Sequence, residues 1–291
     1  MIVSVVLPTK DRGPEIDLTL DALLRQDHRG FEVVIVDNLS CAEDAERLRA
    51  RAAAAPQRLR YVREDRLGLN NARNRGIAAS RGRILAFLDD DAIAPPSWVA
   101  NIERAFAAHP AAWAIGSKVI SRFTTPPPAW LDERLQLFLS GFDRGESIET
   151  LHYDDYPRGA NMAFRREAFA RCGPFRDCLD RKGDSLLSYG DIEMCYRVER
   201  SGHDVLYIPD AGVEHLIRGD RLTREWFRRR FYWQGRSIAV FERMHFGRLR
   251  VLRKLPYRLA RCVFGGDEFS RQLYRGTIAA AAASLLRSRF E

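Results

Sequence analysis

A regular alternation of short apolar runs and helical patterns over the first 106 residues constrains the fold most. Runs rich in β-branched residues predict strands at residues 2–7, 32–36, 59–62 and 84–88. Helical spacing of apolar residues, or Ala-rich composition, predicts helices at residues 14–26, 42–54, 70–79 and 95–106. Strands that alternate with helices predict an α/β domain with a mainly parallel sheet covered by helices on both faces.

The pattern changes after Ile120 and becomes helical after Leu222. The second stretch predicts strands at 161–164 and 205–208 and helices at 165–172 and 191–201. From Leu222 onward the chain reads as helix, with breaks near Gly247, Pro256 and Gly265. We therefore expect a catalytic domain at 1–218, with a ligand-binding half at 1–120 and a second half at 121–218, followed by a basic helical region at 219–291.

Positive charge is concentrated in that helical region. The chain has a net charge of +8, yet residues 218–261 hold fourteen Lys and Arg against three acids, a net charge of +11. The rest of the chain is near −3. This arm mixes its arginines with aromatic residues, which is typical of a surface for anionic partners. A solvated helical subdomain explains the same pattern, and both interpretations stay open.

Several classes of protein are disfavoured by what the sequence lacks. The five cysteines show no CxxC pairing, which argues against a disulfide framework or structural zinc. No apolar run reaches the ~18–20 residues of a membrane span, and no signal peptide is evident, so we expect a cytoplasmic protein. The turn after the first strand lacks GxGxxG, and no GxxxxGK[ST] occurs, so neither a dinucleotide fold nor a P-loop kinase is expected.

Polar side chains follow several of the expected strands. They occur at residues 9–12, at Asp37 and Asn38, and at the triplet Asp89, Asp90 and Asp91. Ligands of open α/β sheets bind beyond the carboxyl ends of the strands. Adjacent carboxylates repel one another unless a hard cation such as Mg²⁺ or Mn²⁺ takes their oxygens as ligands, although an acidic turn that caps a helix would also fit.

Four segments resemble the family-2 glycosyltransferases with the GT-A fold. They are VVLPT at 5–9, EVVIVDN at 32–38, GLNNARNRG at 68–76 and FLDDD at 87–91. Their order and spacing also match, and the resemblance extends through His215, about three quarters of the chain. It implies a bacterial-type, inverting enzyme that takes its sugar from a nucleoside-diphosphate sugar with the help of Mn²⁺ or Mg²⁺.

The resemblance assigns roles at the donor side. Asp37 matches the acid that accepts the imide N–H of uracil, and Asp91 matches the metal-binding acid of the DxD pattern. The late VxH segment makes His215 a further metal candidate. The other expected nucleotide-sugar contacts are Pro8, Thr9, Asp11, Asn38, Arg73, Asp89 and Asp90. UDP is the favoured nucleotide, and dTDP presents the same pairing edge.

The acceptor side is carried by two further segments. RGANMAFRR at 158–166 resembles a GxNxxxRR-type segment and brings in Asn161. YGDIE at 189–193 resembles the family's ED segment, with Gly190 in place of the expected Glu. Asp191 is therefore the expected general base, and Glu193 an acceptor-side residue. Asp180 and Asp184 are weaker candidates for orienting the acceptor.

The sequence thus predicts an inverting transfer of sugar to a hydroxyl of a glycan or lipid-linked acceptor, most naturally a growing surface glycan. The basic arm at 218–261 would then contact the inner face of the membrane, and no nucleic acid is expected. Two alternatives remain: a nucleotidyltransferase acting on sugar phosphates, and a degenerate, non-catalytic nucleotide- or glycan-binding module.

Overall fold

The computed structural model describes residues 2–153 and 155–287. Residues 1 and 154 of the predicted catalytic domain and residues 288–291 of the predicted helical region lie outside the described residues. The chain forms two compact units. The first comprises residues up to Phe175 together with Asp191–Ile217. The second comprises Arg176–Gly190 and the chain from Arg218 onward. Residues 176–190, placed by sequence in the second half of the catalytic domain, thus belong to the helical unit.

A mixed sheet forms the centre of the first unit, with the strand order β3-β2-β1-β4-β8-β6-β9-β5 and β7 paired to β9. Its strands are β1 (Val3–Thr9), β2 (Phe31–Asp37), β3 (Leu59–Arg63), β4 (Ile84–Leu88), β5 (Ala92–Ile93), β6 (Ala112–Phe123), β7 (Glu149–Thr150), β8 (Asn161–Arg165) and β9 (Asp204–Ile217). The first four strands are parallel, and β8 runs antiparallel to both β4 and β6. The α/β fold class expected from the alternating pattern is confirmed.

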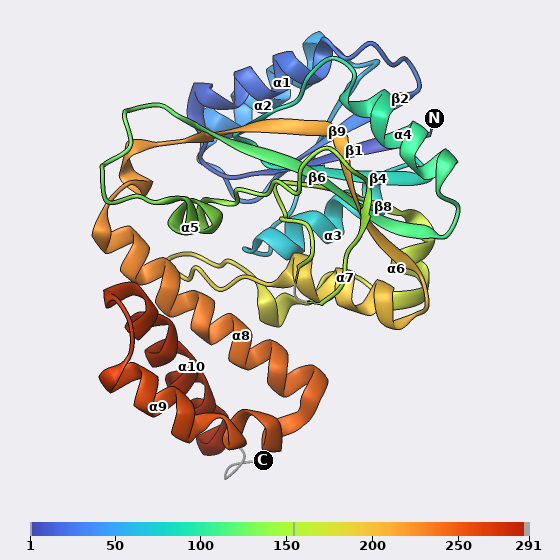
Figure 1. Cartoon of the computed structure of the whole chain (residues 1–291). Coiled ribbons are helices and arrows are strands. Elements are labelled where there is room, and N and C mark those ends of the chain that lie inside the picture. The colour runs from blue at the N-terminus through green and yellow to red at the C-terminus, as the bar shows by residue number, and fades with distance from the viewer. Residues whose placement is uncertain (1, 154, 288–291) are drawn as a thin grey trace. The chain divides into compact units, whose positions relative to one another are not determined.

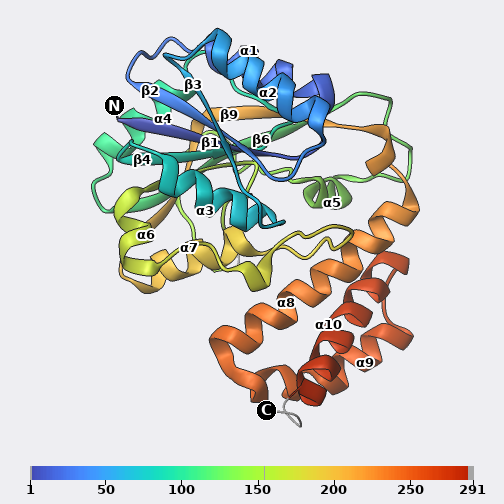
Figure 2. The ribbon, with the colours of Figure 1, turned by 180° about the vertical axis from the view of Figure 1, so that it is seen from behind.

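Helices cover both faces of this sheet. Figures 1 and 2 show α1 (Ile16–Leu24) and α2 (Ala42–Ala54) on one face, and α3 (Leu69–Ala79), α6 (Arg166–Cys172) and α7 (Gly190–Arg200) on the other. Every residue of β1 and β2 is buried as a result. The remaining elements of this unit are α4 (Trp98–Ala108), α5 (Glu133–Gln136) and the 3₁₀ turns Gly13–Glu15 and Leu137–Leu139.

Two long strands, β6 and β9, depart from the sequence expectation. No strand is predicted at β6, and the prediction for β9 ends at Ile208. Their parallel pairing is interrupted by register shifts, one of them between Ser117 and Val119. β6 also includes Gly116, where an added Cβ would lie 2.1 Å from the Pro157 side chain. Irregular registers and small residues remove the period-two alternation on which strand prediction depends.

The second unit is helical, as the sequence predicts. It contains α8 (Arg224–Arg253), α9 (Leu255–Phe264), α10 (Glu268–Arg287) and the 3₁₀ turns Asp177–Leu179 and Gly219–Arg221. Gly247 kinks α8 with a φ of 81°, and α9 starts with proline in its first turn. An added Cβ at Gly235 would lie 1.9 Å from the Leu273 carbonyl oxygen, so α8 and α10 cross with their backbones in close contact.

Within the described part of the chain, no helix is long and apolar enough to cross a membrane.

Candidate active site

Parallel pairing brings the ends of β1, β2 and β4 to one edge of the sheet. Thr9 is in register with Asp37 across β1 and β2, and the acidic triplet follows Leu88 at the end of β4. β8 is antiparallel to β4 with Asn161 opposite Leu88, so the start of β8 reaches the same edge. Chain segments far apart in sequence therefore converge at the carboxyl edge, where open α/β sheets bind ligands.

The middle acid of the triplet, Asp90, is turned into the protein. Its Oδ2 accepts a 2.6 Å hydrogen bond from the Thr9 hydroxyl, and its Oδ1 lies 2.5 Å from the Arg12 guanidinium. Burial raises the pKa of Asp90, while the positive charge of Arg12 opposes that shift. The Arg12 guanidinium also lies 3.1 Å from Asp91. Asp90 and Thr9 thus hold the loop after β1 against the loop after β4.

The outer two acids share one space with a histidine. Ligand atoms of Asp89, Asp91 and His215 all lie within 4.8 Å of one another. β5 directly follows the triplet and pairs with β9, with Ala92 opposite His215. This register brings the imidazole to the acids, and His215 Nε2 lies 3.0 Å from Asp91 Oδ1.

This donor set fits a divalent cation. His215 Nδ1 lies 3.0 Å from the Leu139 carbonyl oxygen, which can only accept a hydrogen bond, so Nδ1 donates to it. His215 Nε2 faces a carboxylate oxygen of Asp91, and this arrangement needs a cation or a proton between the two atoms. An octahedral ion with bonds of about 2.1 Å spaces its ligands by roughly 3–4 Å. The ligand atoms of Asp89, Asp91 and His215 lie within 4.8 Å of one another, so a small adjustment of their side chains would bring them to that spacing.

Asp37 is completely buried at the end of β2. Its Oδ2 accepts hydrogen bonds from the Tyr61 hydroxyl at 2.6 Å and from Arg63 at 3.0 Å, and its Oδ1 accepts one from the Ser40 N–H at 2.8 Å. Burial by itself would raise the pKa of Asp37, but these hydrogen bonds and the Arg63 charge outweigh it, and the pKa is lowered. A carboxylate accepts about four hydrogen bonds, so Oδ1 retains capacity for one more donor.

Three other predicted donor-side residues shape the loops of this edge. Asn38 donates to the carbonyls of Glu64 and Arg66 and accepts from the Gly68 N–H at 2.8 Å, so its amide fixes the turn before α3. Pro8 is buried within β1, opposite Val36. Asp11 adopts a φ of 48°, a strained conformation of the kind that collects at functional sites.

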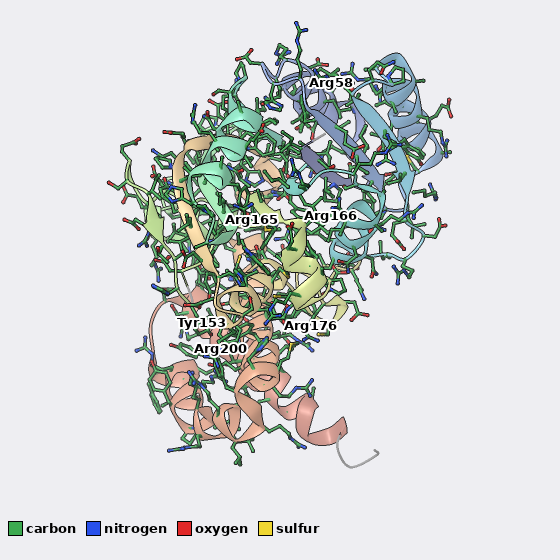
Figure 3. All side chains as sticks on the ribbon, turned by 90° about the vertical axis from the view of Figure 1, so that its right-hand side faces the viewer. Arg58, Tyr153, Arg165, Arg166, Arg176 and Arg200 are labelled. Atoms are coloured by element: carbon green, nitrogen blue, oxygen red, sulfur yellow. The ribbon has the colours of Figure 1, made fainter. Side chains whose placement is uncertain are left out.

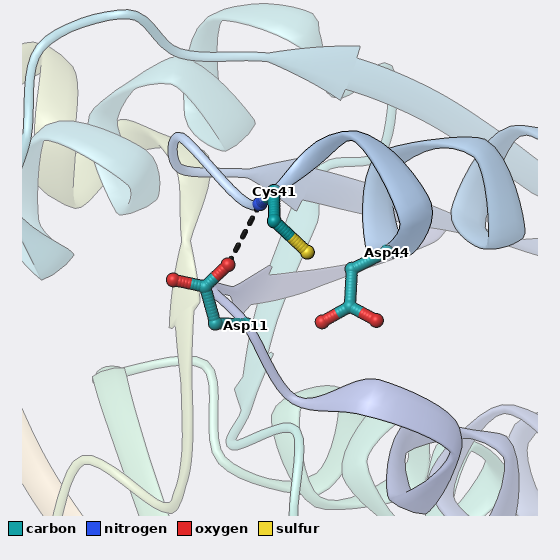
Figure 4. A group of neighbouring side chains, drawn as sticks. All are labelled: Asp11, Cys41 and Asp44. Atoms are coloured by element: carbon teal, nitrogen blue, oxygen red, sulfur yellow. Dashed lines mark hydrogen bonds between the residues drawn. The ribbon is translucent and has the colours of Figure 1, made fainter.

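Asp11 belongs to a second group of neighbouring ligand atoms, with Cys41 and Asp44 (Figure 4). Asp11 Oδ1 accepts from the Cys41 N–H at 2.7 Å, and its other oxygen pairs with Lys10. Asp44 Oδ2 accepts from the Gly13 N–H at 2.9 Å. Both carboxylates thus connect the loop after β1 to the start of α2, which accounts for the cluster without a ligand.

Arg73 lies between Asp89 and Asp191, the predicted general base. Its Nη2 lies 3.9 Å from Asp89 Oδ1 and donates to the Gly159 carbonyl at 3.2 Å. The Gly159 N–H in turn donates to Asp191 Oδ2 at 2.8 Å, while Asp191 Oδ1 accepts from the Ile192 N–H. A Cβ at residue 159 would lie 2.5 Å from Arg73 and 3.1 Å from Asp191. Only glycine allows both groups to approach this backbone.

The predicted acceptor-side residues Asn161 and Glu193 are both engaged inside the fold. The Asn161 amide accepts from the Trp98 ring N–H at 3.0 Å and donates to the carbonyls of Lys118 and Ala211. Glu193 is fully buried and pairs with Arg197 at 2.8 Å. Residues two apart on a helix point about 200° from one another, so Glu193 faces away from Asp191.

Arg165 and Arg166, the paired arginines of the segment 158–166, lie at the opposite edge of the sheet from the acids. Arg165 lies opposite Ile84, at the start of β4, whereas the acids follow its end. Arg165 donates to the Ala112 and Phe106 carbonyls, and Arg166 donates to the Gly82 and Ser80 carbonyls. Both side chains are labelled in Figure 3. They close helix and loop ends and take no part in the acidic site.

The family model described as "Glycosyl transferase family 2" matches residues 4–173, more than half of the chain. The chain belongs to glycosyl transferase family 2. A glucosyl-dolichyl phosphate glucuronosyltransferase of Haloferax volcanii is 27% identical over 250 residues, which cover 84% of this chain and 79% of that protein. The protein is a glycosyltransferase that uses a nucleotide-sugar donor.

Solved structures show that this family-2 transferase has the GT-A fold. The mannosyltransferase PcManGT of Pyrobaculum calidifontis, in complex with GDP-Man and Mn²⁺, has a TM-score of 0.61 at 20% identity and covers 98% of this chain and 78% of its own. GalNAc-T7 with UDP, GalNAc and Mn²⁺ has a TM-score of 0.64 at 16% identity, over 95% of this chain and 54% of its own. The nucleotidyltransferase and non-catalytic alternatives are not favoured.

Several residues of the transferase site were not predicted individually. Arg12 balances two acids, Tyr61 and Arg63 hold Asp37, and Gly159 separates Arg73 from Asp191. Arg12 and Gly159 lie inside motifs quoted from the sequence, so their positions were noted without a role. Nothing in the sequence of β3 marks Tyr61 and Arg63 as partners of Asp37, because that pairing follows from the register of β2 and β3.

Proposed function

We propose that the protein is an inverting glycosyltransferase that moves a sugar from a uridine-diphosphate sugar to a hydroxyl group of a lipid-linked glycan. The chief support is that the candidate cation ligands and the candidate general base lie at one edge of the sheet. Asp89, Asp91 and His215 offer ligand atoms to one cation, and the Arg73–Gly159 contact leads from Asp89 to Asp191.

Asp91, His215 and Asp89 would hold Mn²⁺ or Mg²⁺, and the imidazole ligand favours Mn²⁺, because Mg²⁺ prefers oxygen ligands alone. When bound, the ion supplies positive charge that stabilises the diphosphate leaving group. Arg73 adds a fixed guanidinium on the same side. Arg12 pairs with Asp90 and with Asp91, and the cation would balance the negative charge that remains on Asp89 and Asp91.

Asp37 is the proposed reader of the base. The remaining acceptor capacity of its Oδ1 suits the imide N–H of uracil, which thymine shares and which guanine presents in a different arrangement. Tyr61 and Arg63 hold the carboxylate in place. The Mn²⁺ complex of the archaeal neighbour contains GDP-Man, so the fold alone does not select the nucleotide.

Asp191 is the proposed general base. The acceptor oxygen forms a bond to the anomeric carbon, the bond from that carbon to the diphosphate breaks, and the diphosphate leaves with the electron pair. The hydroxyl proton passes to the Asp191 carboxylate. Two backbone N–H groups fix this side chain, so its free lone pairs have a defined direction. Asn161 and Glu193 would act only by holding the surrounding backbone in place, without contact to the acceptor.

The lipid-linked acceptor is supported by the archaeal relative, whose name specifies a sugar carried on dolichyl phosphate. That relative aligns over most of both chains.

A thermal-shift panel tests the donor assignment. A ligand that binds only the native state raises the melting temperature by mass action. We expect UDP-sugars with Mn²⁺ to stabilise the protein most, GDP-sugars to have little effect, and Asp37→Asn to abolish the preference. Equal stabilisation by UDP- and GDP-sugars would refute the base-reading role of Asp37. Release of UDP from the best donor in the presence of a lipid-linked acceptor then tests transfer.

A further inference from the structure

Helix α9 presents its apolar residues outward and a charged residue inward. Arg258 is 5% exposed, and its Nη2 lies 2.5 Å from Glu242 Oε2 within the helical unit. The large apolar side chains of α9 are exposed instead: Tyr257 59%, Leu259 50%, Val263 64% and Phe264 88%. An ordinary surface helix has the opposite arrangement.

The two faces of α9 are separated along its whole length. Leu255, Arg258 and Cys262 are buried or half-buried, and they recur at the three- and four-residue spacing of one helix face. At 100° per residue, Tyr257, Leu259, Val263 and Phe264 fall on the remaining arc, together with the exposed Pro256 and Ala260. The outward face of α9 is therefore apolar along its length, with the exposed Arg261 at its edge.

Exposure of this kind is concentrated in one segment. Among the described residues, the three most exposed large apolar side chains are Phe264, Leu249 at 76% and Val263, all between residues 249 and 264. Elsewhere, exposed apolar side chains such as Leu18 and Ile120 occur singly and are about half exposed. Isolated exposed residues are normal, but a concentrated apolar surface marks a binding site.

The charge around this face identifies the occupant. Residues 243–266 contain seven Lys and Arg and no Asp or Glu. Arg248, Arg250, Arg253 and Arg261 are exposed. A second copy of the chain would bring the same positive charge against this one, and like charges facing each other oppose association. An apolar face with basic flanks instead matches an anionic lipid surface.

We propose that α9 lies in the headgroup region of an anionic membrane, with Tyr257, Leu259, Val263 and Phe264 inserted among the acyl chains. The exposed arginines of residues 248–261 then reach the lipid phosphates. Three aromatic residues of the basic arm, Phe227, Phe231 and Phe241, are buried at 0–3% exposure and would not reach a membrane. The proposal therefore narrows the contact expected of residues 218–261 to α9 and the arginines beside it.

Co-sedimentation with vesicles tests this assignment on the full chain. The vesicles are phosphatidylcholine alone or phosphatidylcholine with phosphatidylglycerol. The wild type should pellet only with the anionic vesicles, and each engaged arginine contributes about a five-fold gain in partition at low salt. Raising the salt from 0.1 M to 1 M shortens the Debye length from ~10 Å to ~3 Å, so binding should weaken but a salt-resistant fraction should remain.

The neutral double variant Val263→Ser/Phe264→Ser removes apolar area and keeps every charge. Because both side chains are exposed, the fold should persist, which circular dichroism and the melting temperature verify. We expect its partition to fall about 10–100-fold and the salt-resistant fraction to disappear. The control is Leu18→Ser/Ile120→Ser, two exposed apolar positions outside the helical unit, which should bind as the wild type does.

The proposal would be overturned if the Val263→Ser/Phe264→Ser variant co-sedimented with anionic vesicles to the same extent as the wild type. A failure of the wild type to bind anionic vesicles would also overturn it, as would a concentration-dependent dimer in sedimentation equilibrium that this variant abolishes, since the face would then serve a second copy. UDP binding in Mn²⁺, measured on the same samples, should be unchanged by these substitutions. A failed donor assignment and a failed membrane assignment therefore give different results.

Discussion

His215 Nε2 lies 3.0 Å from Asp91 Oδ1, although the two residues are 124 positions apart in the sequence. The contact exists because the short strand β5 follows the acidic triplet and pairs with β9. The opposite side of the imidazole is held by the Leu139 carbonyl. One strand pairing therefore places a nitrogen ligand beside two carboxylates, and the proposed metal-dependent chemistry depends on it.

Asp191→Asn should separate catalysis from donor binding. The amide keeps the size of the side chain and loses the proton-accepting oxygen, so turnover should fall by about 10²–10⁴. The Kd for UDP with Mn²⁺ should stay unchanged. Steady-state kinetics and calorimetry on the same preparation measure the two quantities. Wild-type turnover would show that another carboxylate acts as the base, and Asp184 would be the next candidate.

Gly159→Ala should impair activity through Arg73. The new methyl group would lie 2.5 Å from the Arg73 guanidinium, which must move away from Asp89. We expect kcat/KM to fall at least ten-fold, a loss of about 1.4 kcal/mol in transition-state stabilisation. A double-mutant cycle with Arg73→Ala isolates this effect. If the two substitutions prove additive, Gly159 acts independently of Arg73.

Asp37 should contribute to acid sensitivity. Its pKa in the folded protein is lowered below the ordinary value of 3.8, so its stabilisation is complete above that value. As the pH falls below 3.8, Asp37 takes up a proton in the unfolded chain before it does so in the folded protein. The stabilisation therefore declines, and it is lost once the pH has fallen through the lowered pKa of the folded state. The free energy of unfolding of Asp37→Asn should therefore decline less steeply below pH 3.8 than that of the wild type. Parallel curves from denaturant titrations would contradict this assignment.

Glu242 should stabilise the helical unit. It is 3% exposed and pairs with both Lys254 and Arg258. Glu242→Ala leaves Arg258 buried without its counter-charge, which costs about 3 kcal/mol. The matched control is Glu268→Ala, whose pairs with Arg224 and Arg228 lie at the surface and contribute less than about 1 kcal/mol. Equal effects in chemical denaturation would show that burial of the Glu242 pair is unimportant.

Local patterns predict the fold well where they are regular. The helix expected at residues 42–54 is observed as Ala42–Ala54, and the strand at 84–88 as Ile84–Leu88. The break near Gly247 is observed as a kink with positive φ. β6 was missed because Gly116, Ser117 and Lys118 interrupt its apolar pattern, and its stability comes from pairing with β8 and β9.

The site was predictable as a set of residue types and less so as a set of contacts. Asp89, Asp91 and His215 were all named from motifs, and the structure brings them together. The inward orientation of Asp90 depends on Arg12 and Thr9, which reach it through the pairing of β1 and β4. Asn161 and Glu193 also stand in recognised segments, but their partners Trp98 and Arg197 are set by packing, which no motif records.

Calorimetric titration of UDP with and without Mn²⁺, on the wild type and on Asp91→Asn, is the decisive test of the metal site. The wild type should bind UDP much more tightly when Mn²⁺ is present. Asp91→Asn should lose this gain, while its melting temperature without ligand should stay close to that of the wild type. Equal Mn²⁺-dependent affinity in both proteins would contradict the assignment of Asp89, Asp91 and His215 as the metal site.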